Sequence, residues 1–183
     1  GPNKYDSSFS LYLWSYGEPF IFMNPYMEQA DKLGIRIAFE NLEGAEFLYA
    51  LLGRYPQAGF CWDSGHDHCY PHKLNFLESF GERLIMTHLN DNLGIKAYDG
   101  TITWLDDLHL LPFDGIADWE NIAKRLHRCN FRDILTFELN VKSKPGRHEN
   151  DRYAQMSYEQ YVAEAYNRAC RIAAMLLAEE GKN

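Results

Sequence analysis

Four short apolar segments of this sequence each end in a side chain that can bind a metal ion. The four residues are Glu40 in IRIAFEN, Asp63 in GFCWDSGH, His88 in LIMTHLND and Glu138 in ILTFELN. Three carboxylates and an imidazole are a donor set suited to Mn²⁺, Mg²⁺, Co²⁺ or Zn²⁺. Any one of them could cap a helix or form an ion pair. Four at the ends of successive apolar segments predict a site for one divalent cation.

A second group of ionisable residues lies near the first in the sequence. His66 follows Asp63 by three residues, and Asp107 and His109 lie in the segment DDLHLLPFDG. These three side chains could bind substrate hydroxyls, or they could together hold a second metal ion. Hydrogen bonding within a loop is the structural alternative.

Asp91 follows His88 by three residues in the segment HLNDN. A carboxylate at this spacing could orient a metal-bound imidazole from behind, or it could contact substrate. Capping of the following loop is the alternative for Asp91.

The segments that must position these residues alternate between extended and helical patterns. The expected strands, each short and apolar, span residues 35–40, 59–63, 84–88 and 134–139, with a further short segment at 108–111. The expected helices span residues 24–34, 43–55, 71–80, 118–129 and 157–181. Asp118 is a good N-cap, and Ser157 with Gln160 forms a capping box. This alternation predicts parallel βα units, either in a doubly wound sheet or in a barrel, which normally needs about 250 residues.

The composition indicates a single globular domain. The chain has 183 residues, of which 46% are hydrophobic, enough for a sizeable core. Its formal net charge of -8 disfavours nucleic acid as a partner, because such binding rests largely on lysine and arginine. The four cysteines form no CxxC pair, and no apolar stretch has the length of a membrane span. We therefore expect a soluble cytoplasmic protein with reduced thiols.

Taken in order, the segments IAFENL, WDSGH, THLNDN, DLHLLPFDGIADW and FELN resemble the xylose isomerase-like TIM-barrel superfamily. That superfamily includes sugar phosphate isomerases and epimerases and the family 2 AP endonucleases. The resemblance runs from about Asn24 to the C-terminus. It implies that Glu40, Asp63, His88 and Glu138 are the metal ligands at the ends of barrel strands four, five, six and eight, with residues 108–111 as strand seven.

The resemblance leaves the first three strands of a (β/α)8 barrel without a counterpart. Residues 1–183 are therefore expected to form one incomplete TIM-barrel domain, in which an aromatic segment over residues 1–23 precedes βα units over residues 24–183. An open barrel exposes apolar strand edges. We therefore expect either a homo-oligomer or association with the missing part of the barrel.

The resemblance implies a metal-dependent isomerase or epimerase acting on a small sugar, sugar phosphate or related polyol. The cation would bind a carbonyl oxygen and an adjacent hydroxyl oxygen and so acidify the neighbouring C–H. Glu40 and Glu138 would lie on opposite sides of that carbon, and would remove and return a proton through a metal-stabilised enediolate. The arginine that such epimerases often carry after the histidine of strand six is absent from HLNDNLGIK, where Lys96 is the candidate substitute.

Two other functions remain open at this point. The residues His66, Asp107 and His109 match those that hold the third metal ion of the AP endonucleases, so the alternative enzyme is a metal-dependent phosphodiesterase. The net charge of -8 speaks against it. A catalytically inactive barrel fragment acting as an assembly or binding module is the third hypothesis.

Overall fold

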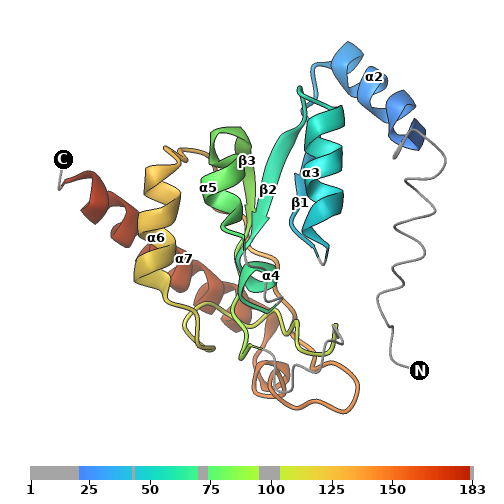
Figure 1. Ribbon diagram of the computed structural model, residues 1–183. Helices are drawn as coiled ribbons and strands as arrows, with labels where there is room; N and C mark the ends of the chain where they lie inside the picture. Colours follow the sequence, from blue (N-terminus) through green and yellow to red (C-terminus); the bar gives the residue numbers. More distant parts are fainter. Residues whose placement is uncertain (1–20, 43, 70–73, 95–103, 182–183) are drawn as a thin grey trace.

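The fold is a three-stranded parallel sheet with helices packed against it (Figure 1). The computed structural model describes residues 21–42, 44–69, 74–94 and 104–181. Strands β1 (Ala38–Glu40), β2 (Gly59–Asp63) and β3 (Leu84–His88) lie side by side in the order β1-β2-β3. Within the described residues β1 pairs only with β2, so its outer edge is open. The order of elements confirms the predicted α/β architecture with parallel strands.

Four of the five expected helices begin and end within two residues of the predicted bounds. Helix α2 (Asn24–Leu33) ends at Gly34, whose φ of 66° is left-handed, and α3 spans Ala45–Arg54. Helix α6 (Trp119–Arg128) is capped by Asp118, whose side chain accepts a hydrogen bond from the backbone of Asn121. The long α7 (Tyr158–Glu180) starts with the predicted capping box and lies beside α6 (Figure 1). Short 3-10 segments cover Ile21–Met23, Gly81–Arg83 and Tyr153–Gln155.

Strand β2 contributes core side chains on one face of the sheet and a candidate metal ligand on the other. Phe60 and Trp62 are fully buried in a cluster with residues of α3, α5 and α6. Because side chains alternate along a strand, Cys61 and Asp63 point to the opposite face. Asp63 is in register with His88 on β3, so two of the candidate ligands end adjacent strands at the same level.

Two of the expected strands are reduced to single bridges. The segment expected at 134–139 lies parallel to the residues after β3, but only Phe137 forms a bridge, with Leu89. The Thr87 hydroxyl interrupts a regular ladder there, because it bonds both the amide and the carbonyl of Thr136.

The segment expected at 108–111 was also predicted wrongly as a strand. Leu110 makes one antiparallel bridge, with Asp91. The backbone of the preceding residue, His109, has a φ of 51°, a left-handed conformation that cannot continue an extended strand.

Two helical segments also differ from expectation. The residues directly after β2, for which no helix was expected, form the short helix α4 (Ser64–Cys69). Helix α5 covers only Phe76–Phe80, because Asn75 caps it, and residues 70–73 lie outside the described part. In the described part of the chain no helix is long and apolar enough to cross a membrane.

Candidate metal centre

The structure brings the four strand-end residues Glu40, Asp63, His88 and Glu138 together. One donor atom from each lies within 4.8 Å of the donor atoms of the other three. Metal–ligand bonds to nitrogen and oxygen measure about 2.0–2.2 Å, so opposite ligands of one ion lie roughly 4.2 Å apart. The chemistry and spacing of this donor set therefore fit one divalent cation after small side-chain movements.

His88 lies between the two glutamates. Its Nδ1 is 3.0 Å from Glu40 Oε1 and 3.1 Å from Glu138 Oε2. Hydrogen bonds with the Cys61 thiol and with Glu40 raise the pKa of His88 to about 11. The imidazole therefore carries a proton at neutral pH in the metal-free protein, and an incoming cation must displace it.

Asp63 is fully buried and held by neighbours at the ends of the strands. Its Oδ1 accepts a hydrogen bond of 2.8 Å from the His66 amide, and the Asn90 amide group donates to both carboxylate oxygens, at 3.2 and 3.0 Å. The Asn41 side chain bonds the Asp63 amide and carbonyl, at 2.7 and 2.9 Å, and so joins the ends of β1 and β2. Burial outweighs the charge of His66 and raises the pKa of Asp63 to about 6.

Asn41 and Asn90, which hold Asp63 in place, were not predicted from the sequence as residues of the site. Asn41 directly follows Glu40, and Asn90 lies two residues after His88. Their positions immediately beyond strand-end ligands were the available signal. Both are fully buried, and both fix backbone or carboxylate atoms of the centre.

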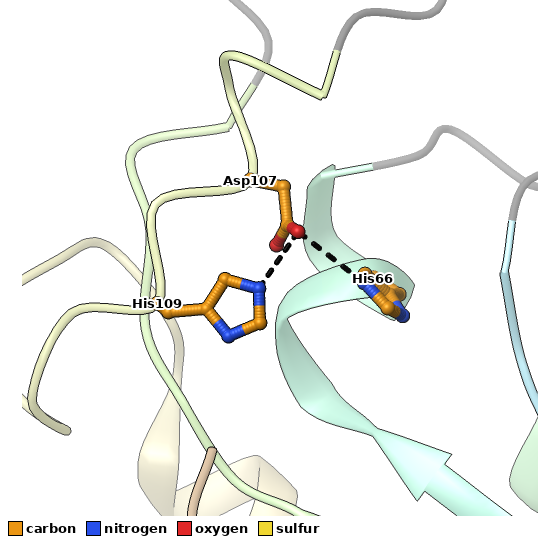
Figure 2. Close-up of side chains that lie close together, drawn as sticks. All are labelled: His66, Asp107 and His109. Atoms are coloured by element: carbon orange, nitrogen blue, oxygen red, sulfur yellow. Dashed lines mark hydrogen bonds and ion pairs between the residues drawn. The ribbon is translucent and has the colours of Figure 1, made fainter. Parts of the chain in front are cut away.

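His66, Asp107 and His109 form a second cluster (Figure 2). Asp107 Oδ2 lies 2.8 Å from His109 Nε2 and 3.4 Å from His66 Nε2. On its other side, His66 Nδ1 lies 2.9 Å from the Asn41 carbonyl oxygen and 3.4 Å from Glu40 Oε1. His66 therefore links the two clusters.

The charges of the second cluster stabilise one another. Burial lowers the pKa of His66, but the hydrogen bond with Asp107 and the nearby carboxylates outweigh it and raise that pKa to about 9. Burial raises the pKa of Asp107, but hydrogen bonds with His109 and His66 hold it well below its usual range. The donor types of the trio would suit either a metal ion or substrate hydroxyls.

Asp91 does not occupy the position expected for a partner of His88 or of substrate. It is fully buried, and its carboxylate accepts hydrogen bonds from the amides of Asn92, Phe113 and Ala117 and from the indole of Trp119, at 2.8–3.1 Å. These bonds fold residues 113–119 around the carboxylate, so Asp91 organises the loop. Lys96 lies outside the described residues.

Comparison with known proteins identifies the family to which the chain belongs. A profile of the family described as "Xylose isomerase-like TIM barrel" matches residues 22–159, so the chain belongs to that family. A curated relative, the "Uncharacterized protein y4fM" of Sinorhizobium fredii (strain NBRC 101917 / NGR234), is 38% identical over 148 residues. That match covers 74% of this chain and 44% of the relative, so the chain spans less than half of the relative's length.

Solved structures share the fold at low sequence identity. A xylose isomerase domain protein from Alicyclobacillus acidocaldarius subsp. acidocaldarius superposes with a TM-score of 0.57 and 16% identity, over 82% of this chain and 54% of that one. A D-tagatose 3-epimerase-like protein gives a TM-score of 0.57 and 18% identity, over 91% of this chain and 60% of that one. The predicted α/β fold of the xylose isomerase-like type is confirmed, and the three parallel strands of the described residues are compatible with an incomplete barrel.

The affinity of the centre for a metal ion is expected to rise with pH. At neutral pH the cation must displace the proton of His88, whose pKa is about 11, and below pH 6 it must also displace that of Asp63, whose pKa is about 6. The association constant for Co²⁺ should therefore increase about tenfold per pH unit above neutrality, and more steeply below pH 6. Calorimetric titration in buffers of different ionisation enthalpy counts the released protons. An affinity independent of pH would contradict this protonation scheme.

Proposed function

We propose that the chain carries the metal centre of a sugar or sugar phosphate isomerase or epimerase. The observation that supports this most is the convergence of Glu40, Asp63, His88 and Glu138 at the ends of the parallel segments. The carboxyl ends of barrel strands are where TIM-barrel enzymes carry their active sites. The similarity to a D-tagatose 3-epimerase-like protein agrees in chemical class.

The two glutamates are the proposed acid and base. Both lie next to His88 Nδ1, and the Glu138 side chain is 48% exposed while that of Glu40 is 23% exposed. The more exposed Glu138 is thus the more accessible of the two to an incoming substrate. Glu40 would approach the substrate from the end of β1. One carboxylate would take the proton from the substrate carbon and the other would return it. A divalent cation held by the four ligands would polarise the substrate carbonyl.

His66 is the proposed substrate-positioning residue. It reaches from the metal centre to Asp107, and its side chain is only 8% exposed. An imidazolium has two N–H donors, and its Nε2–H, which lies 3.4 Å from Asp107 Oδ2, can be given to a sugar hydroxyl instead. The assignment of Asp107 and His109 to the same subsite follows from their contacts with each other and with His66.

The open edge of β1 is the proposed place for closure of the barrel. Ile35, just before β1, is 57% exposed, and Ile134 near the other end of the parallel array is 82% exposed. Unpaired strand edges with apolar side chains tend to pair with further strands. We propose that additional barrel strands, or a second copy of the chain, cover these edges, and that the protein acts in the cytoplasm with its four free cysteines reduced.

A metal-dependent phosphodiesterase is the second candidate. The cluster of His66, Asp107 and His109 supports it, because a further cation there would be typical of a multinuclear site. The net charge of -8 opposes binding to a nucleic acid.

Parallel assays separate the two enzyme classes. The protein loaded with Mn²⁺ or Co²⁺ is incubated with a panel of aldoses, ketoses and their phosphates, and separately with an oligonucleotide that contains an abasic site. We expect interconversion of at least one sugar in the panel and an intact oligonucleotide. Cleavage of the oligonucleotide without sugar turnover would overturn the proposal.

A further inference from the structure

We infer that Lys144 takes the place of a second metal ion at the cluster of His66, Asp107 and His109. In the structure its ammonium group lies beside the Asp107 carboxylate, which a second cation would need as a ligand. This inference rests on the proposed function, because it makes the centre mononuclear and assigns the cluster to substrate hydroxyls.

Lys144 is held tightly beside Asp107. Its Nζ lies 3.5 Å from Asp107 Oδ2, donates a hydrogen bond of 2.7 Å to the Trp104 carbonyl and lies 4.9 Å from the centre of the Trp104 ring. The Lys144 side chain is only 13% exposed. A carbonyl acceptor, an aromatic face and a carboxylate thus surround one ammonium group.

The loop that carries Lys144 is fixed to the segment that carries Asp107. The Arg147 guanidinium bonds the Leu105 carbonyl and the Asp106 carboxylate, each at 2.8 Å. The Asn150 side chain bonds the carbonyls of Leu108 and Asn140, at 3.1 and 2.7 Å. These contacts fix the position of Lys144, because Arg147 and Asn150, both on its loop, tie that loop to the segment of Asp107.

An ammonium group at this distance competes with a divalent cation for the same oxygen. Asp107 Oδ2 is already in contact with the side chains of His66, His109 and Lys144. A second metal ion bound there would lie close to the positive charge of Lys144 and would be repelled by it. Asp107 Oδ1, by contrast, is buried and accepts no hydrogen bond from the described part of the chain. An acceptor of this kind suits a hydroxyl donor of a polyol substrate.

The number of Co²⁺ ions bound per chain tests the inference directly, by equilibrium dialysis followed by elemental analysis. We expect one equivalent for the wild type and two for Lys144→Met, which keeps most of the length of the side chain and removes its charge. Adding His109→Ala to Lys144→Met should return the number to one. Lys142→Met is the matched control, because Lys142 is exposed on the same loop, and it should bind one equivalent.

Two results would overturn the inference. One is a folded Lys144→Met protein, with a thermal transition like that of the wild type, that gains no second ion. The other is a wild-type protein that binds two ions, together with an Asp107→Asn variant that binds one. This comparison needs no change at Lys144. Failure of the proposed function looks different: the wild type would then bind no ion, whereas Lys144→Met would still gain one that depends on His109.

Discussion

Replacement of Glu138 by glutamine is expected to lower kcat for sugar epimerisation or isomerisation by about 10²–10⁴-fold, the usual contribution of a positioned acid or base. The amide keeps the shape of the side chain but can neither take up a proton nor supply a strong anionic ligand. Because Glu138 Oε2 lies 3.1 Å from His88 Nδ1, the same change should also weaken Co²⁺ binding. Steady-state kinetics and metal titration on one protein preparation measure both effects.

A matched glutamate provides the control for this change. Glu28→Gln removes an exposed carboxylate on α2, outside the metal centre, and should leave both kcat and Co²⁺ affinity unchanged. Glu40→Gln should resemble Glu138→Gln, since Glu40 Oε1 contacts the same nitrogen at 3.0 Å. If Glu138→Gln kept wild-type turnover at saturating metal, the role of Glu138 in proton transfer would be refuted.

Replacement of Asp91 by alanine is expected to lower the free energy of unfolding by about 3–5 kcal/mol, a range typical of breaking a buried charged network. The change leaves the amides of Phe113 and Ala117 and the indole of Trp119 without their buried acceptor. Residue 115 is a glycine because the carboxylate of Asp91 fills the space where its Cβ would lie. Urea unfolding followed by tryptophan fluorescence measures the loss.

An exposed aspartate distinguishes this effect from a general loss of charge. Asp133→Ala lies in an exposed turn and should change the free energy of unfolding by less than about 0.5 kcal/mol. If Asp91→Ala instead kept wild-type stability and lost metal affinity or turnover, the role first expected for Asp91, at the metal or the substrate, would be restored.

The elements that depend on local sequence were predicted well. Asp118 caps α6 and Ser157 with Gln160 begins α7, because a cap is a contact between residues three positions apart. The ends of β2 and β3 at Asp63 and His88 were also predicted, since a short apolar run closed by a polar residue marks the end of a buried strand. Helix α4 and the left-handed His109 were missed, because they follow from packing against distant segments.

Residue type and short spacing were enough to establish the parallel βα order, the helix caps and four potential ligands. Which groups share an environment followed only from the packing of the folded chain. It placed Asn41 and Asn90 on Asp63 and turned Asp91 into the anchor of a loop. It also set Lys144 against Asp107, 37 residues away in the chain. Contacts across such separations depend on how loops pack in three dimensions, and no local pattern encodes them.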